Sequence, residues 1–188
     1  MKKAIFLDRD GTINIEKDYL YKIEDFQFEY KVPEAMSLLK KLNYLLIVVT
    51  NQAGIGRGYY KESDLEILND FLINKSKKFG GNIEKIYYCP HHPTEGIDKY
   101  RQDCLCRKPG NAMIEQAIIE FNIDRASSYM VGDKLSDLEA GIKSNITPIL
   151  IRTGYGKTTE KELYDSQYKD QFITYNSLYD FAMSLKNK

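Results

Sequence analysis

Short apolar runs alternate with amphipathic segments along most of this 188-residue chain. The apolar runs are rich in branched and aromatic residues and predict buried strands at residues 4–7, 44–49, 83–88, 129–131 and 149–151. Apolar residues recur at helical spacing at residues 33–42, 63–72, 113–121 and 135–142, and a weak strand at 172–173 precedes a helix from about residue 177. Ser63, with Glu66 three residues later, predicts a capping box at one helix start.

This alternation of strands and helices predicts an α/β fold, with a doubly wound, Rossmann-like parallel sheet and helices on both faces. Residues 1–188 are expected to form a single domain with a minimal cap domain or none. Two polar stretches, 89–110 and 153–170, interrupt the pattern and are predicted to be loops. Loops of that length are usually functional or disordered.

Composition and charge exclude broad classes of partner. Lys plus Arg equal Asp plus Glu at 27 each, so the chain has no overall field that would attract nucleic acid or a membrane surface. The longest aliphatic run, residues 45–49, is too short to span a bilayer, and the N-terminus lacks a signal-peptide pattern. We therefore expect a cytoplasmic protein that acts on a small molecule. We also expect a monomer, because the sequence shows no extra helix or apolar stripe for a partner.

Chemically reactive residues gather where predicted strands end. Because the carboxyl ends of parallel strands meet at one edge of a sheet, where ligands bind, these side chains are expected to form one site. A lone acidic pair after a strand is more often a turn, so it is the joint occurrence that indicates catalysis. The residues are Asp8 and Asp10, Thr50 and Asn51, Arg107 and Lys108, and Asp133, Lys134 and Asp137.

The acidic members of this set predict a metal site. Asp8, Asp10 and Asp133 would crowd negative charge into one crevice, which requires a cation or a shared proton, and carboxylate oxygens suit Mg²⁺. In an extended chain, residues two apart share a face. Asp8 and Asp10 are therefore expected to point toward one phosphate, with Arg9 turned away.

The same set can perform phosphoryl transfer. The hydroxyl of Thr50 and the cations of Arg107 and Lys108 are donors that a transferring phosphoryl group requires. One carboxylate can attack as a nucleophile and form an aspartyl-phosphate. A second can protonate the leaving oxygen and then activate water.

All three cysteines and both histidines lie between residues 89 and 106. An odd number of cysteines in one stretch indicates reduced thiols or metal ligands. Four nitrogen and sulfur ligands fit a closed tetrahedral Zn²⁺ site, which is structural because no position is left for water. Spacing alone leaves His92 as an alternative ligand. The two ligand pairs are Cys89 with His91, and Cys104 with Cys106.

Several motifs together resemble the haloacid dehalogenase-like phosphatases. They are FLDRDGTIN, VVTNQAGIGRGYY, IYYCPHHP, CLCRKPG, SYMVGDKLSD and IRTG, which span residues 4–156. Within that family they are similar to the heptose bisphosphate phosphatases, with the histidinol-phosphate phosphatases as close relatives. The resemblance implies a Mg²⁺-dependent phosphatase that removes the 7-phosphate of a heptose 1,7-bisphosphate through an aspartyl-phosphate, in nucleotide-activated heptose biosynthesis for surface polysaccharide such as lipopolysaccharide. Histidinol phosphate is the alternative substrate.

The resemblance also implies a role for each matching position. Asp8 is the nucleophile, Asp10 the general acid and base, and Thr50 and Lys108 stabilise the phosphoryl group. Mg²⁺ is held by Asp8, the backbone carbonyl of Asp10 and Asp133, with Asp137 behind them. The implied zinc ligands are Cys89, His91, Cys104 and Cys106. The implied substrate pocket is lined by Glu16, Lys17, Asp18, Tyr19, Thr50, Asn51, Gln52, Ala53, Arg107, Lys108 and Lys134.

Two other classes of protein stay open: a phosphorelay receiver, and a zinc-stabilised binding module without catalysis. Receivers phosphorylate an Asp on a later strand, and a non-catalytic module has no need of both Asp8 and Asp10. Relatives often carry a second residue-Pro pair where this chain has Gly110 and Asn111, a departure that concerns substrate preference. Arg57 is equally suited to a ligand and to solvent, and Tyr60 is expected to pack against other side chains.

Overall fold

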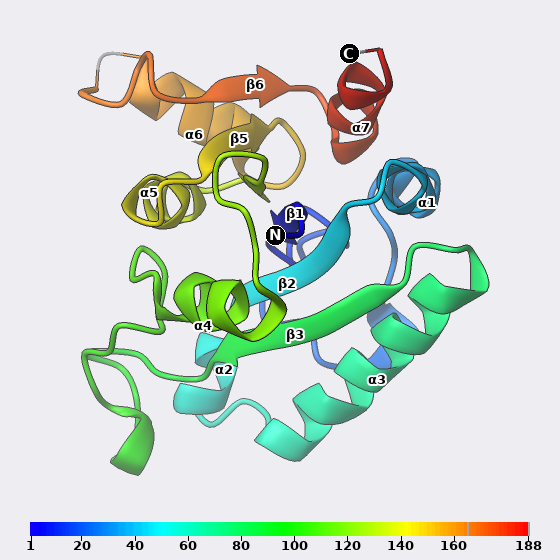
Figure 1. The fold of residues 1–188 in the computed structure, drawn as a ribbon. Coiled ribbons are helices and arrows are strands. Elements are labelled where there is room, and N and C mark those ends of the chain that lie inside the picture. The colour runs from blue at the N-terminus through cyan, green and yellow to red at the C-terminus, as the bar shows by residue number, and fades with distance from the viewer. Residues whose placement is uncertain (165, 188) are drawn as a thin grey trace.

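Six parallel strands form one sheet in the computed structural model, in the order β3-β2-β1-β4-β5-β6 (Figure 1). The structure describes residues 1–164 and 166–187. This order, with the chain winding outward in both directions from β1, confirms the predicted doubly wound sheet. The strands are β1 (Ala4–Leu7), β2 (Leu45–Asn51), β3 (Ile83–Cys89), β4 (Tyr129–Gly132), β5 (Thr147–Ile151) and β6 (Ile173–Tyr175).

Helices cover both faces of this sheet (Figure 1). Side chains of α1, α3 and α7 pack in one core with alternate residues of the central strands, such as Ile5 and Leu46. Side chains of α4 and α5 pack in a second core with the intervening residues, such as Phe6 and Ile47. The helices are α1 (Val32–Lys41), α2 (Ala53–Gly56), α3 (Glu62–Lys78), α4 (Ala112–Phe121), α5 (Leu135–Lys143), α6 (Gly156–Leu163) and α7 (Leu178–Lys186).

The continuous apolar runs of the sequence follow from this double cover. Residues Ala4 through Leu7 are all fully buried, because each face of β1 contacts a different core. A strand buried on both faces has no polar side to show, so its sequence reads as an unbroken apolar run. The strand predictions are therefore correct to within one or two residues at each end.

Two local predictions are wrong. The stretch 153–170 is not a loop throughout, because α6 occupies residues 156–163; only Gly156, Thr159 and Leu163 of this helix are buried, so its apolar face holds too few large residues to show a periodicity. The predicted capping box at Ser63 lies inside α3. That helix starts after Lys61, whose backbone N–H donates to the Asp64 carboxylate at 2.8 Å.

The apolar pattern of the sequence did not predict the shorter helical elements. The four-residue helix α2 follows directly after β2, and single 3₁₀ turns lie at Ile23–Asp25 and Asp98–Tyr100. The second of these turns lies within the stretch 89–110, which is otherwise irregular as predicted. In the described part of the chain, every helix is too short or too polar to cross a membrane.

Candidate active site

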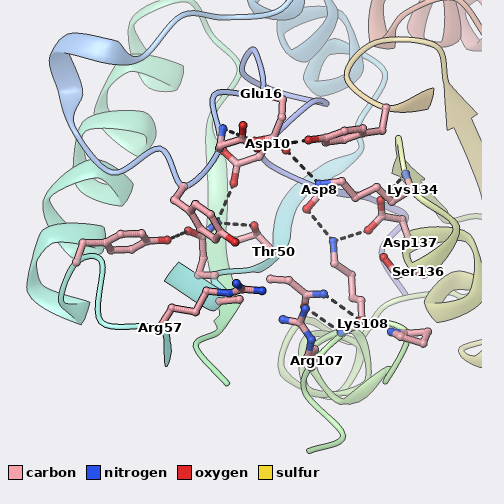
Figure 2. A pocket seen from close by; sticks show the side chains of 18 residues that line it. Asp8, Asp10, Glu16, Thr50, Arg57, Arg107, Lys108, Lys134, Ser136 and Asp137 are labelled. Atoms are coloured by element: carbon pink, nitrogen blue, oxygen red, sulfur yellow. Dashed lines mark hydrogen bonds and ion pairs between the residues drawn. The ribbon is translucent and has the colours of Figure 1, made fainter. Parts of the chain in front are cut away.

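A pocket of about 530 Å³ opens at the carboxyl ends of β1, β2 and β4. Figure 2 shows side chains from these strand ends and from the loop before α4 pointing into it. Lys17 is exposed and does not line the pocket, and Asp133 is fully buried beside it. The predicted residues that line the pocket are Asp8, Asp10, Glu16, Asp18, Tyr19, Thr50, Asn51, Gln52, Ala53, Arg107, Lys108 and Lys134.

The ammonium group of Lys108 lies between two carboxylates at the floor of the pocket (Figure 2). Its Nζ is 2.7 Å from Asp8 Oδ1 and 2.6 Å from Asp137 Oδ1, and it donates to the Val49 carbonyl at 2.7 Å. Only 3% of Lys108 is exposed. Burial alone would lower the pKa of Lys108, but the carboxylates of Asp137 and Asp8 raise it above its usual value, so the side chain stays charged. The nucleophile candidate is thus held by a fixed cation.

The backbone around Lys108 is fixed by Asn51, the last residue of β2. The Asn51 amide accepts a hydrogen bond from the Lys108 N–H at 2.9 Å and donates to the Lys108 carbonyl at 3.0 Å. This pairing uses both ends of the carboxamide. Asn51 therefore contributes to the site by placing Lys108, although the sequence predicted a substrate contact.

The Asp10 carboxylate is held by Arg9, which does not line the pocket; this contact was not predicted from the sequence. The strand β1 ends at Leu7, and the Arg9 carbonyl then accepts N–H groups of residues 12–14, so the chain curls and the alternation of extended backbone no longer applies. Arg9 is fully buried, and its Nη2 is 2.9 Å and 2.8 Å from the two oxygens of Asp10. Burial would raise the pKa of Asp10, but Arg9 and donors from Asn14 and Gln52 hold it below its usual value.

A cluster of buried carboxylates lies next to this pair. Oxygens of Asp8, Asp133 and Asp137 lie within 4.8 Å of one another, and the three residues are 5%, 0% and 1% exposed. Burial raises the pKa of Asp133 to about 8, and the charges of Asp8 and Asp137 add to the rise. Burial also raises the pKa of Asp8 to about 6, although Lys108 opposes it. Buried carboxylates that repel one another in this way are stabilised by a bound cation.

One atom of the cluster fits a metal ligand directly. Asp133 Oδ1 is buried and has no hydrogen-bond partner among the described residues, whereas Asp133 Oδ2 accepts the Tyr155 N–H at 2.7 Å. A buried carboxylate oxygen without a donor is costly unless a cation binds it. The donor set of carboxylate oxygens suits a hard cation such as Mg²⁺, so the residues fit the predicted metal.

Two glycines leave the space that Asp133 occupies. A Cβ on Gly11 would lie within 2.3 Å of Asp133 Oδ2, and one on Gly154 within 2.2 Å of the same atom. Gly11 also has φ +84°, a conformation that side chains rarely adopt. The glycine of the first motif and the glycine after β5 are therefore required by the position of one carboxylate.

Other parts of the pocket wall carry charged and aromatic groups that the sequence only partly indicated. Lys134 Nζ lies 3.1 Å from Glu16 Oε2 and 4.7 Å from the centre of the Tyr155 ring. Arg57 pairs with Glu95 and packs over the Tyr19 ring, so it lines the pocket with its side chain partly exposed. The lining residues to which the sequence assigned no role in the site are Tyr60, Pro109, Ser136 and Tyr155.

The cysteine stretch folds into a second cluster, away from the pocket floor. The His91 Nδ1 atom and the three thiol sulfurs lie within 4.8 Å of one another, and the cysteines form no disulfide. Contacts such as Cys104 Sγ to Cys106 Sγ at 3.1 Å and His91 Nδ1 to Cys106 Sγ at 3.3 Å indicate convergence on one point. The four converging residues are Cys89, His91, Cys104 and Cys106.

The second histidine, His92, does not join the cysteine cluster and forms a hydrogen bond within the loop. His92 Nδ1 accepts the backbone N–H of Glu95 at 3.0 Å and so shapes the loop. The cluster is linked to the pocket through Arg107, whose Nη1 donates to the His91 carbonyl at 3.2 Å. Of the two histidines left open by spacing, the structure brings His91 to the sulfurs.

Comparisons with known proteins agree with this geometry. The HAD-hydrolase-like family model matches residues 105–181. A D-glycero-beta-D-manno-heptose-1,7-bisphosphate 7-phosphatase of Haemophilus ducreyi is 46% identical over 183 residues, covering 96% of this chain and 97% of the relative. The protein of the same name from Escherichia coli K12 is 46% identical over 186 residues, covering 98% and 94%.

Solved structures give the same result. The D,D-heptose 1,7-bisphosphate phosphatase of B. bronchiseptica, complexed with magnesium and phosphate, superposes with a TM-score of 0.85 and 28% identity over 98% of both chains. The D,D-heptose 1,7-bisphosphate phosphatase of Burkholderia thailandensis gives a TM-score of 0.72 and 27% identity over the full length of both. The likeness to these two structures therefore extends over nearly the whole chain.

Proposed function

Because this chain belongs to the family of the D-glycero-β-D-manno-heptose-1,7-bisphosphate 7-phosphatases, we propose that it hydrolyses the 7-phosphate of D-glycero-β-D-manno-heptose 1,7-bisphosphate. The observation that carries the proposal is the pocket floor, where Lys108 holds Asp8 beside Asp10 and a cluster of buried carboxylates. The relatives' names favour this substrate over histidinol phosphate, and an enzyme over a phosphorelay receiver or a binding module. The product would then feed nucleotide-activated heptose biosynthesis.

We assign nucleophilic attack to Asp8. A carboxylate oxygen of Asp8 forms a bond to phosphorus as the bond from phosphorus to the sugar oxygen breaks. Lys108 keeps the carboxylate in place and, with the Thr50 hydroxyl at the end of β2, offers donors to the phosphoryl oxygens. Thr50 is 1% exposed, so its hydroxyl is fixed by packing before substrate arrives.

We assign both proton transfers to Asp10. It gives a proton to the departing sugar oxygen, and in the second half-reaction it takes a proton from the water that attacks the aspartyl-phosphate, which returns Asp8 to a carboxylate. The low pKa of Asp10 beside Arg9 supports the second role, because a base must be ionised. The charge of a bound phosphate close by would raise that pKa and so favour the first role.

Two metals complete the proposal. Mg²⁺ would be held by the carboxylates of Asp8 and Asp133 and the backbone carbonyl of Asp10, and it would neutralise charge on the phosphoryl group. The unpartnered oxygen of Asp133 supports this site, as does the magnesium and phosphate complex of the B. bronchiseptica structure. We propose that Zn²⁺ binds the converging cluster of Cys89, His91, Cys104 and Cys106 as a structural ion.

The rim of the pocket supports recognition of a polar sugar with a second phosphate. Arg107 is positioned by the loop that the zinc cluster fixes, and we assign it, with Lys134, to contacts with the substrate. The carboxylates of Glu16 and Asp18 can accept hydrogen bonds from sugar hydroxyls. We further propose that the protein is a single-domain enzyme that acts as a monomer in the cytoplasm.

The test of the proposed function is a kinetic comparison on the purified protein. Release of inorganic phosphate is measured with both anomers of the heptose 1,7-bisphosphate and with histidinol phosphate. We expect the highest kcat/KM for the β anomer and no turnover by Asp8→Asn, while Asp70→Asn, the same change on the exposed surface of α3, keeps wild-type activity. Dominant activity with histidinol phosphate would contradict the substrate, and activity of Asp8→Asn would contradict the nucleophile.

A further inference from the structure

We propose that Gln52 is a positioning residue for catalysis: its amide holds the Asp10 carboxylate and the Thr50 hydroxyl in register, and the hydroxyl of Tyr60 orients that amide. The sequence predicted a substrate contact for Gln52, and for Tyr60 only packing against other side chains. The inference rests on the proposed function, in which Asp10 transfers protons and Thr50 binds the phosphoryl group.

The Gln52 amide forms its hydrogen bonds with other side chains of the protein. Its Nε2 donates to Asp10 Oδ2 at 2.9 Å and to Thr50 Oγ1 at 2.9 Å, and its Oε1 accepts the Tyr60 hydroxyl at 2.5 Å. A carboxamide has two N–H donors, and both are used here. Gln52 is also only 2% exposed. It therefore borders the pocket without a donor left for substrate, and its effect must pass through Asp10 and Thr50.

Tyr60 determines which way the amide points. A flipped amide would place Oε1 against the Asp10 carboxylate, where two acceptors repel each other. Burial raises the pKa of the Tyr60 hydroxyl, so it stays protonated and donates to Oε1. With the oxygen held by Tyr60, Nε2 faces Asp10 and Thr50, the only orientation in which both hydrogen bonds form.

The fold around this chain of contacts is built to bring Tyr60 there. A Cβ on Gly54 would lie 2.3 Å from the Tyr60 ring, so this glycine of α2 leaves the space for the ring. The ring of Tyr21 stacks on that of Tyr60 with centroids 4.9 Å apart. The Gln52 N–H donates to the Cys89 carbonyl at 2.7 Å, which fixes the start of the Gln52 side chain.

The contact also joins two catalytic elements. Asp10 follows β1, whereas Thr50 is part of β2. Arg9 and Asn14, which also donate to Asp10, both belong to the same loop as Asp10 itself. Gln52 links the Asp10 carboxylate to the strand that carries Thr50. The distance between the proton donor, Asp10, and the residue that binds the phosphoryl group, Thr50, therefore stays constant. Side-chain placement of this kind changes rates because proton transfer requires a defined geometry.

The test uses Gln52→Met, which keeps the length of the side chain without the amide, and Tyr60→Phe, which keeps the ring. Tyr21→Phe is the matched control, since it removes a hydroxyl from the ring stacked on Tyr60. For each variant, kcat/KM is measured with the heptose bisphosphate and with p-nitrophenyl phosphate. The sugar oxygen needs a proton to leave, whereas p-nitrophenolate leaves without one. Because kcat/KM reports the step in which the leaving group departs, the ratio of the two values isolates proton donation.

We expect Gln52→Met to lower kcat/KM for the heptose bisphosphate by about 30-fold or more, within the range of acid catalysis, and for p-nitrophenyl phosphate by less than about fivefold. Tyr60→Phe should give a smaller loss with the same selectivity, and Tyr21→Phe none. Adding Tyr60→Phe to Gln52→Met should cause no further loss, because the hydroxyl acts through the amide. Thermal unfolding of each variant shows whether the fold is kept.

Two results would overturn the inference while the proposed function stands. One is an equal loss with both substrates, which is what a general structural disturbance produces. The other is an additive effect of the two substitutions. Failure of the wild-type protein to hydrolyse either phosphate ester would instead overturn the proposed function, and this inference with it. The inference is supported if the wild-type protein is active, if Tyr60→Phe alone lowers kcat/KM, and if Tyr60→Phe causes no further loss when Gln52→Met is already present.

Discussion

Substitution of Lys108 tests how strongly the pocket floor depends on one buried cation. In Lys108→Met the carboxylates of Asp8 and Asp137 lose a partner at 2.7 Å and 2.6 Å, and both stay buried. Removing one member of a buried ion pair typically lowers the free energy of unfolding by about 3–5 kcal/mol, because the remaining charge stays uncompensated. For a protein of this size that corresponds to a melting temperature lower by roughly 6–20 °C.

The matched control is a surface pair of the same length. Lys85 Nζ lies 2.7 Å from Glu120, but both side chains are 40% exposed. Exposed pairs contribute about 0–1 kcal/mol, so Lys85→Met should change the melting temperature by no more than about 4 °C. Burial, and not distance, decides the difference between the two substitutions.

The assay is thermal unfolding of both variants with and without added Mg²⁺. Without it, Lys108→Met should be far less stable than wild type. With it, part of the loss should return, because the cation takes over charge neutralisation among the carboxylates and a ligand of the folded state stabilises it. Phosphatase activity should fall by about 10²–10³-fold, the usual effect of removing one donor to a reacting group. If Lys108→Met melted within a few degrees of Lys85→Met, the reasoning about the buried charge cluster would be refuted.

Three further substitutions probe the surroundings of this cluster. Gly11→Ala should weaken Mg²⁺ activation at least tenfold, seen as a shift in the Mg²⁺ dependence of the rate, because its Cβ would overlap Asp133; an unchanged dependence would contradict the close approach. Cys106→Ser should abolish zinc by elemental analysis and lower activity, and full activity without zinc would show that the metal does not position the loop. Asn51→Ala should lower kcat about tenfold with little change in KM, since it loosens Lys108 without touching substrate, and a pure KM effect would restore the role in substrate binding.

The sequence predicted the sheet and most of the site because both depend on local patterns. Apolar runs such as 45–49 are set by burial on two faces, and the reactive residues lie at strand ends whatever the loops do. The parallel order brings Asp8 and Asp133 to one edge of the sheet, and the loop before α4 brings Lys108 to them. The helix α6 was missed because its buried face has one large apolar residue, Leu163.

The contacts that hold the site together could not be predicted, for a common physical reason. The sequence predicted substrate contacts for Asn51 and Gln52 and placed Arg9 away from the phosphate. In the structure all three side chains hold other groups of the protein. Spacing in sequence shows that a side chain is near a pocket, but not whether its donors are already used. That depends on contacts from distant segments, such as Tyr60 on Gln52, and on the turn that ends β1 one residue before Asp8.

The position of Lys108 shows why these supporting contacts matter. Its side chain could be drawn toward Asp8 and Asp137 by charge alone, but its backbone is fixed independently, by the paired hydrogen bonds with Asn51 and by the cysteine cluster that ends two residues earlier at Cys106. A cation placed by its loop keeps its position when a phosphoryl group arrives and changes the local charge. A cation placed only by the carboxylates would move with them. The cysteine cluster and Asn51 therefore both fix the position of the Lys108 ammonium group. Electrostatic stabilisation of a reacting phosphate requires a charge that is fixed in this way.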